Sequence, residues 1–256
     1  ADDANGATTL TITVADVNEA PVVANAIADA STNEDAAYSL DISSVFSDVD
    51  SGDSCTYSMS GAPSTITLSS GTISGTPVNA NVGAHTIVVT CTDGSSAAVS
   101  DSYVLTVTNT NDAPTVTSAI ADASTAEDAS YSLNAAAAFT DVDSGDTLTY
   151  TMSGAPSTLS ISSGTISGTP TNANVGAHTI VVTATDGSNA AVSDTFILTV
   201  TNTNDAPTVA NAIADASTAE DASYSVSVSN VFADVDTGDS CTYSMSGAPS
   251  TITLSS

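Results

Sequence analysis

A 93-residue internal repeat is the feature of this chain that most limits how it can fold. The junction motif Asn-(Glu/Asp)-Ala-Pro recurs with that period, at residues 18–21, 111–114 and 204–207. About three quarters of the positions in 18–110 and 111–203 are identical, and neither copy contains an insertion. We therefore expect four segments, since a fixed period of this length indicates a tandem array. These are the last strand of a preceding repeat (1–17), two complete repeats (18–110 and 111–203) and the N-terminal part of a third, truncated repeat (204–256).

Each repeat has the pattern of a β-sandwich. Apolar residues alternate with Ser and Thr in 38–42, 55–59, 87–91 and 103–107, which is the period of strands with one buried face. Turn residues such as Gly, Pro, Asp and Ser separate these segments. Seven short strands in 93 residues is the size of an immunoglobulin-like domain. We expect an all-β chain of tandem seven-stranded Greek-key sandwiches arranged end to end. The Ala-rich segment 134–138 is expected to be a strand, like its counterpart 41–45.

The charge of the chain excludes several classes of partner. It contains 29 Asp and Glu but no Lys and no Arg, which gives a formal net charge of -29. Nucleic acids and anionic membranes need cationic side chains to neutralise their phosphates, so we expect neither as a partner. No apolar run approaches the length of about 18 residues that a membrane-spanning helix needs, and we expect no membrane insertion. With 41% hydrophobic residues, the chain can still fold around a core.

Two motifs resemble a known family. Gly-Thr-Ile-Ser-Gly-Thr-Pro at 71–77 and Thr-Ile-Val-Val-Thr-Cys-Thr-Asp-Gly at 86–94 resemble the bacterial cadherin-like and immunoglobulin-like (dystroglycan-type cadherin) tandem repeats of large secreted adhesins. The Asn-Asp-Ala-Pro junctions, the Asp-Val-Asp pairs and the Thr-Asp-Gly turns are similar to the calcium-binding signatures of cadherins. The resemblance covers essentially the whole chain and implies extracellular adhesin repeats. The mid-domain Leu-Asp-Arg-Glu of cadherins has no counterpart here, because the chain has no Arg.

The acidic residues gather at turns that we expect to meet between repeats. In a seven-strand tracing, the first turn and the end of the last strand lie at one end of a domain. The turns after the second and sixth strands lie at the other end. The linker at 111–112 then collects Glu34, Asp35, Asn111, Asp112, Asp141, Asp143, Asp146 and Asp186. The next junction has Glu127, Asp128, Asn204, Asp205, Asp234, Asp236 and Asp239, and the top of the first repeat has Asn18, Glu19, Asp48, Asp50, Asp53 and Asp93.

We interpret these clusters as calcium sites. Bare carboxylates a few ångströms apart repel each other, and Ca²⁺ takes about six to eight oxygen ligands in a flexible shell. The clusters contain no thiolate or imidazole, which argues against zinc or copper. Two other interpretations stay open. The motifs could be solvated turns that use Asp and Gly for their backbone conformations, and a halophilic or marine origin could explain the acidity, although it would spread acids over exposed strand faces.

The cysteines predict a disulfide. Cys55 and Cys91 both alternate with core residues, and their equivalents in the second repeat, Leu148 and Ala184, are changed together. A pair that is either Cys with Cys or Leu with Ala indicates contact in space. We therefore predict a Cys55–Cys91 disulfide and a location outside the cytosol; the alternative is two buried free thiols. Cys241 is equivalent to Cys55, and its partner is expected beyond residue 256.

The sequence favours a structural function over a catalytic one. It has no Gly-x-Ser-x-Gly motif and suggests no Ser-His-Asp grouping, so we do not expect an enzyme. We expect stalk repeats of an extracellular bacterial surface adhesin or filament, stiffened by calcium where neighbouring repeats meet, with an unidentified surface ligand. A self-assembling fibre or sheath of identical chains is an alternative, because no lysine guards the edge strands. A carbohydrate- or ligand-binding module is another, although the chain has no Trp.

Overall fold

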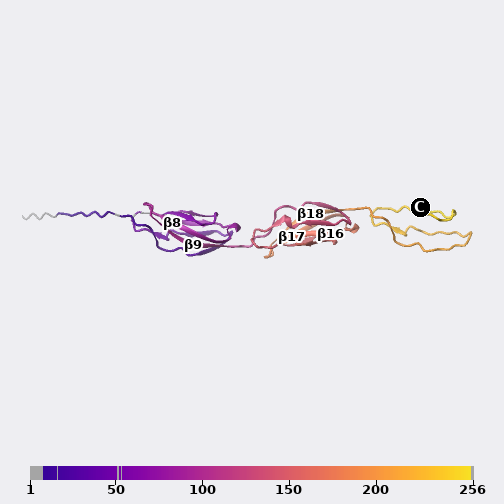
Figure 1. Cartoon of the computed structure of the whole chain (residues 1–256), viewed down its shortest axis with the longest axis horizontal. Coiled ribbons are helices and arrows are strands. Elements are labelled where there is room, and N and C mark those ends of the chain that lie inside the picture. The colour runs from indigo at the N-terminus through magenta and orange to yellow at the C-terminus, as the bar shows by residue number, and fades with distance from the viewer. Residues whose placement is uncertain (1–7, 16, 51, 53, 255–256) are drawn as a thin grey trace, which may run out of the picture. The chain divides into compact units, whose positions relative to one another are not determined.

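The computed structural model describes residues 8–15, 17–50, 52 and 54–254 (Figure 1). The chain divides into two compact units, Ala1–Asn111 and Asp112–Ser256. The first unit contains repeat 18–110. The second contains repeat 111–203 and the segment 204–256.

Repeat 18–110 is a sandwich of a four-stranded and a three-stranded sheet. The four-stranded sheet has the order β2 (Ala30–Asn33), β9 (Ala98–Thr108), β8 (Gly83–Thr92) and β5 (Thr56–Ser60). The three-stranded sheet has the order β3 (Tyr38–Asp41), β7 (Thr72–Gly75) and β6 (Ile66–Ser69). Strands β2 and β9 are parallel, whereas the other neighbours are antiparallel. A further pair joins β1 (Val22–Val23) to β4 (Phe46–Ser47), and the 3₁₀ turn η1 (Asn79–Asn81) precedes β8.

Repeat 111–203 repeats this architecture. Its four-stranded sheet is β11 (Ala123–Ala126), β18 (Ala191–Thr201), β17 (Gly176–Thr185) and β14 (Thr149–Ser153). Its three-stranded sheet is β12 (Tyr131–Asn134), β16 (Thr165–Gly168) and β15 (Leu159–Ser162). The short pair is β10 (Thr115–Val116) with β13 (Phe139–Thr140), and two 3₁₀ turns are η2 (Ala136–Ala138) and η3 (Asn172–Asn174). The expected all-β sandwich is confirmed, because the two larger sheets of each repeat together hold seven strands.

The core of each repeat lies between its two sheets and follows the period-two pattern of the sequence. In the first repeat, Ile87, Val89 and Cys91 alternate along β8 and are fully buried. Ile73 on β7 faces them from the other sheet as part of the same core cluster. Burying an aliphatic side chain of this size contributes about 1.5–3 kcal/mol, so this alternation fixes which face of each strand points inward.

The expectation of a strand at 134–138 is wrong. Only Asn134 belongs to β12, and the next residues form the 3₁₀ turn η2. The counterpart in the first repeat also forms a turn after Asp41. There the Asp41 carboxylate accepts a hydrogen bond of 2.8 Å from the backbone amide of Ser43. Ile42 and Ala135 are buried, so the apolar alternation was genuine. It continues past the end of each strand because the turn folds back onto the core.

The segment 204–256 is less regular in the part that the structure describes. Its strands are β19 (Thr208–Val209) and β20 (Phe232–Ala233), which pair with each other. By repeat position, the partners of its other strands would be counterparts of β7, β8 and β9, and 204–256 contains no such sequence. Residues 8–15 and 17 are assigned to no strand, so the assignment of 1–17 to a preceding repeat stays a prediction. Among the described residues, no helix has the length and apolar character needed to span a membrane.

Candidate metal centre

Glu127 and Asp128 lie in the turn between β11 and β12. Strand β11 runs parallel to the end of β18, with Ala126 opposite Thr201. The amide of Glu127 extends this ladder by donating to the Thr201 carbonyl at 3.0 Å. Asp128 has a left-handed backbone with φ 58°, a conformation that Asp adopts more readily than most residues. The strand pairing therefore fixes Glu127 beside the residues that lead out of β18.

The carboxylate of Glu127 is buried and only half satisfied. The side chain is 2% exposed. Its Oε1 accepts a hydrogen bond from the amide of Thr203 at 2.8 Å, whereas Oε2 is buried without a hydrogen-bond partner. The chain has no Lys or Arg to pair with it, and the ring of His178 donates through Nε2 to the Asn174 carbonyl at 2.7 Å. Because a buried carboxylate without a compensating charge is strongly unfavourable, Oε2 is suited to be a cation ligand.

Asp205, in the linker that follows repeat 111–203, completes the first acidic group of this junction. One carboxylate oxygen each from Glu127, Asp128 and Asp205 lie within 4.8 Å of one another. The amide of Asp205 also donates to Oδ2 of Asp236 at 2.7 Å. Carboxylates from both sides thus hold the linker, through the amides of Thr203 and Asp205.

The loop after β20 carries the second acidic group. Asp234, Asp236 and Asp239 also have ligand oxygens within 4.8 Å of one another. Oδ1 of Asp234 accepts the amide of Asp236 at 3.0 Å, and the amide of Asp239 donates to the Asp236 carbonyl at 3.2 Å. Asp236 is 5% exposed. Hydrogen bonds among its own acidic residues therefore hold the conformation of this loop.

The two acidic groups act on one linker carboxylate. Desolvation raises the pKa of Asp205 most, and the negative charges of Asp236, Asp128, Glu127 and Asp234 raise it further, in that order. Carboxylates that raise each other's pKa in this way are relieved when a divalent cation binds between them. The acids that the sequence analysis assigned to this junction fall in these two groups, and their binding of calcium stays a prediction.

The first unit contains the same turn at the end of repeat 18–110. The amide of Thr110 donates to Oε1 of Glu34 at 2.8 Å. Glu34 is 2% exposed, and its Oε2 is buried without a partner. Asp35, like Asp128, is left-handed, with φ 56°. The geometry found at Glu127 therefore occurs twice.

The second unit contains the matching loop at the start of repeat 111–203. The amide of Asp112 donates to Oδ2 of Asp143 at 2.7 Å. Asp141, Asp143 and Asp146 have ligand oxygens within 4.8 Å of one another. Desolvation raises the pKa of Asp146, and Asp141, Asp143 and Asp186 raise it further. The linker at 111–112 falls where the two units divide, so the convergence of Glu34, Asp35 and Asn111 with these acids stays a prediction.

Of the six ligands predicted at the top of repeat 18–110, five lie among the residues that the structure describes. The side-chain amide of Asn18 donates to Oδ2 of Asp93 at 3.0 Å, and this contact is the main cause that lowers the pKa of Asp93. The amide of Glu19 donates to Oδ2 of Asp50 at 2.8 Å. Asp48 accepts the amide of Asp50 at 3.0 Å through Oδ1, while its Oδ2 is buried without a hydrogen-bond partner.

Asn204 is exposed, and its side-chain amide donates to the carbonyl of Asp205 at 2.8 Å. Asp53 lies outside the residues that the structure describes. One residue of the junction was missed: Asn172, in η3, donates through Nδ2 to Oδ1 of Asp236 at 3.0 Å. Its sequence signal was the Asn-Ala-Asn that also occurs at 79–81, but an uncharged turn did not suggest a junction residue.

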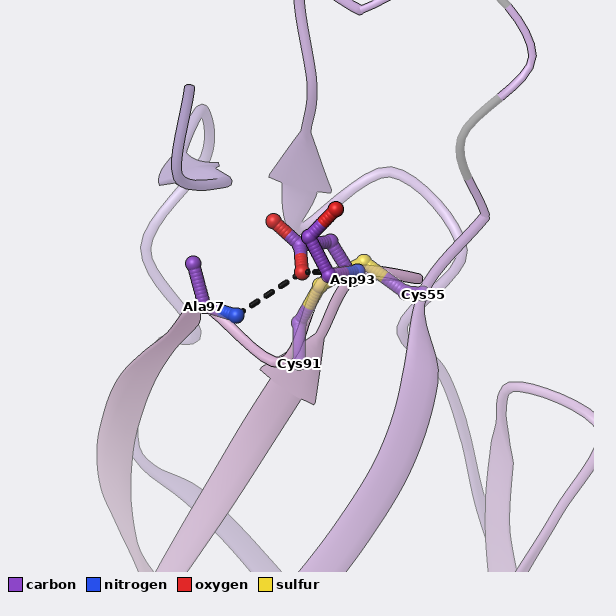
Figure 2. The surroundings of a disulfide bond; sticks show 5 residues. Cys55, Cys91, Asp93 and Ala97 are labelled. Atoms are coloured by element: carbon purple, nitrogen blue, oxygen red, sulfur yellow. Dashed lines mark hydrogen bonds between the residues drawn. A yellow bond between two sulfur atoms is a disulfide. The ribbon is translucent and has the colours of Figure 1, made fainter. Parts of the chain in front are cut away.

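The predicted Cys55–Cys91 disulfide is confirmed, with the two Cα atoms 5.1 Å apart. Figure 2 shows it at the end of β8, beside the turn that Asp93 organises. Oδ1 of Asp93 accepts the amides of Ser95 and Ala97 at 2.9 and 2.8 Å. The bridge therefore ties Cys55, directly before β5 and after the Asp48–Asp50 loop, to β8, the strand that leads into the Asp93 turn.

The donor set of these groups fits a hard divalent cation. The groups are made of carboxylates. Among the described residues, the buried side-chain oxygens without hydrogen-bond partners belong to Glu34, Asp48, Glu127 and Asp141, with the hydroxyl of Tyr131 besides. Calcium is bound by such oxygens, whereas zinc and copper favour nitrogen or sulfur. Glu127, Asp128, Asp205, Asp234, Asp236 and Asp239 are the residues that would hold calcium at the junction described above.

The family model described as "Putative Ig domain" matches residues 20–108 and 113–201, which together are more than half of the chain. The chain belongs to this family. The two matched Ig domains coincide with the two complete sandwiches, and the linker acids Asp112 and Asp205 lie outside the matched residues. The resemblance found in the junction and turn motifs is thus confirmed at the level of the family.

Curated relatives of these Ig domains include adhesins. The chain is 36% identical over 151 residues to the "Serine-rich adhesin for platelets" of Staphylococcus aureus strain MRSA252, which is 57% of this chain and 10% of that protein. The same adhesin of strain MSSA476 is also 36% identical over 151 residues, 57% of this chain and 6% of that protein. The chain thus spans a tenth or less of the length of these relatives.

Solved structures similar to the Ig domains include cadherins. Mouse cadherin-23 EC22-24 has a TM-score of 0.50 and 19% identity, over 72% of this chain and 65% of that one. Human mucin-like protocadherin EC1-2 has a TM-score of 0.51 and 16% identity, over 72% of this chain and 98% of that one. At these identities the likeness shows the fold alone, which is the immunoglobulin- and cadherin-like sandwich.

Proposed function

We propose that this chain is part of the stalk of an extracellular surface adhesin, and that calcium stiffens the stalk where its repeats meet. The observation that carries the proposal is the Glu127 carboxylate. It is 2% exposed, has one oxygen without a partner, and shares an acidic group with the linker residue Asp205. No Lys or Arg in the chain can neutralise it, so a metal cation is the natural counter-ion.

The stiffening follows from how the linker is held. The linker amides of Thr203 and Asp205 donate to Glu127 and Asp236, which belong to different repeats. When bound, calcium would supply the positive charge that draws both carboxylate groups onto the linker. Without that charge, desolvation and then the negative charges of the neighbouring acids make ionised Asp205 unfavourable, and both raise its pKa. The linker then acts as a hinge whose stiffness depends on the ion.

The extracellular location rests on two observations. The relatives are adhesins in name, and the Cys55–Cys91 disulfide is a bond that persists mainly in oxidising compartments. In this proposal the partners of each repeat are its neighbours in the chain, and the surface ligand belongs to another part of the protein. The strands of each repeat support a spacer role, since β9 alone, with 11 residues, is about 36 Å long at roughly 3.3 Å per residue.

Small-angle X-ray scattering of the whole chain tests this function. With saturating calcium we expect a larger maximum dimension and a narrower distance distribution than in EDTA. The double variant Glu127→Gln, Asp205→Asn should lose part of this change, because only one junction is disabled. The variant Glu220→Gln, at the exposed counterpart of Glu127, should keep all of it. Identical scattering of the wild-type chain in calcium and in EDTA would remove calcium stiffening from the proposal.

A further inference from the structure

Asn172 lies at the end of repeat 111–203 that carries Glu127. It is the first residue of η3, in the connection from β16 to β17. The amide of Asp128 donates to the carbonyl of Pro170, in the same connection, at 2.7 Å. This bond fixes the η3 turn next to the turn of Glu127 and Asp128. Asn172 is thus a neutral residue beside the acidic junction.

The backbone of η3 is held rigidly by its own residues. Oδ1 of Asn174 accepts the amide of Thr171 and the hydroxyl of Thr158, both at 3.0 Å. The amide of Asn174 donates to the Thr171 carbonyl at 2.7 Å, and the amide of Val175 donates to the Asn172 carbonyl at 3.1 Å. Asn172 therefore projects from a fixed turn, and the position of its side chain is set by the repeat to which it belongs.

The side chain of Asn172 contacts the acidic loop of the following segment. Its Nδ2 donates to Oδ1 of Asp236 at 3.0 Å. The other oxygen of that carboxylate accepts the amide of Asp205 at 2.7 Å. Both oxygens of Asp236 are thus oriented by hydrogen bonds from the preceding repeat and its linker. Each carboxylate oxygen has a second lone pair, so these bonds orient Asp236 and still allow it to coordinate a cation.

We propose that Asn172 is a positioning residue of the junction: its amide holds Asp236 in the orientation that a calcium ligand needs, and fastens the acidic loop to the preceding repeat before any ion binds. The first part rests on the proposed function, whereas the second does not. An amide suits this place because it donates a hydrogen bond to a carboxylate without adding another negative charge. A carboxylate at 172 would instead repel Asp236.

Two variants and a matched control test this role in the full chain. Asn172→Ala removes the hydrogen bond, and Asn172→Asp replaces it with a negative charge. Asn134→Asp is the control, because it makes the same change of charge at an exposed position of the same repeat. The first repeat has Asp41 at that position, so the fold accepts it. Hydrogen exchange, measured peptide by peptide during a calcium titration, separates this junction from the one at 111–112.

We expect Asn172→Ala to weaken calcium binding at 234–239 about 10-fold or more, the usual effect of losing a residue that orients a metal ligand. In EDTA, the amides of Asp205 and Asp239 should exchange faster in this variant. Asn172→Asp should speed this exchange further, and Asn134→Asp should change neither readout. An unchanged calcium affinity in Asn172→Ala would overturn the positioning role, and unchanged exchange in EDTA would overturn the fastening role. If the wild-type chain binds no calcium, the proposed function and the positioning role fail together, while the exchange in EDTA still decides the fastening role.

Discussion

Replacing Glu127 by Gln removes one negative charge from the junction and keeps the shape of the side chain. The amide oxygen of Gln can still accept the hydrogen bond that Oε1 of Glu127 accepts from Thr203. The buried, unpartnered Oε2 is replaced by the uncharged NH₂ of the side-chain amide. We therefore expect opposite effects on stability. Without calcium, the variant should be more stable than the wild-type chain, and with calcium bound it should be less stable.

The size of both effects follows from simple arithmetic. At a calcium concentration of about 100 times Kd, binding stabilises the wild-type chain by about 2.7 kcal/mol. At about 4–8 °C per kcal/mol for a domain of this size, Tm rises by about 11–22 °C. A loss of about 100-fold in affinity, the upper end of what losing an outer-shell partner of a metal ligand costs, leaves about 0.4 kcal/mol, or about 2–3 °C. Without calcium, relief of a buried unpaired charge worth about 1 kcal/mol should raise Tm by about 4–8 °C.

Thermal unfolding followed by circular dichroism, in EDTA and in calcium, measures both effects. Glu220→Gln is the matched control, because it changes the same residue at the same repeat position where the side chain is exposed. It should behave like the wild-type chain in both conditions. A Glu127→Gln variant with the full calcium-induced rise in Tm, or with a lower Tm than wild type in EDTA, would refute the reasoning.

Three other predictions concern pH, the core and the disulfide. The folded-state pKa of Asp205 is raised above 3.8, so its contribution to stability is fully present below pH 3.8 and is lost as the pH rises through the raised value. In thermal melts in EDTA, the Tm of the wild-type chain should therefore fall as the pH rises over this window. The Tm of Asp205→Asn should fall less steeply. The hydroxyl of Tyr131 is buried without a hydrogen-bond partner, so in a denaturant titration Tyr131→Phe should stabilise repeat 111–203 by about 1 kcal/mol. Tyr38→Phe is the control, because it loses the hydrogen bond of 3.4 Å between the Tyr38 and Tyr103 hydroxyls. It should not stabilise repeat 18–110. Reduction of the Cys55–Cys91 disulfide opens a loop with a sequence separation of 36 and should destabilise repeat 18–110 by about 3–4 kcal/mol. Peptide-resolved hydrogen exchange should show no change in the stability of repeat 111–203. Equal destabilisation of both repeats would contradict this prediction.

Much of the fold was predictable because the same pattern of apolar and turn residues occurs in both complete repeats. Alternation along 87–91 identified a buried strand face, and the structure buries Ile87, Val89 and Cys91. The disulfide was predictable because Cys55 and Cys91 are replaced together in the second repeat, which is what a direct contact requires. The acidic groups were predictable in outline because strand order places the turns that carry them at the ends of the sandwich.

The rest depended on contacts that leave no periodic signal. Asn172 reaches Asp236 across 64 positions of sequence, and nothing in a neutral turn indicates that partner. Asp101, on β9, was equally uninformative in sequence, yet its carboxylate accepts the amide of Ile27 at 2.6 Å and so holds the chain ahead of β2. The turn at Ala136–Ala138 was missed because burial of Ala135 and Ala138 gives a 3₁₀ turn the same apolar appearance as a strand.

Anomalous diffraction from a crystal of the full chain grown in calcium tests the central claim most directly. We expect a peak at the junction bounded by Glu127, Asp205 and Asp236, with carboxylate oxygens at about 2.3–2.6 Å and a total of about six to eight oxygen ligands. Oε2 of Glu127, which has no hydrogen-bond partner, should be one of these ligands. An ordered junction with no anomalous peak, and with Oε2 of Glu127 bonded to water or protein, would contradict the account.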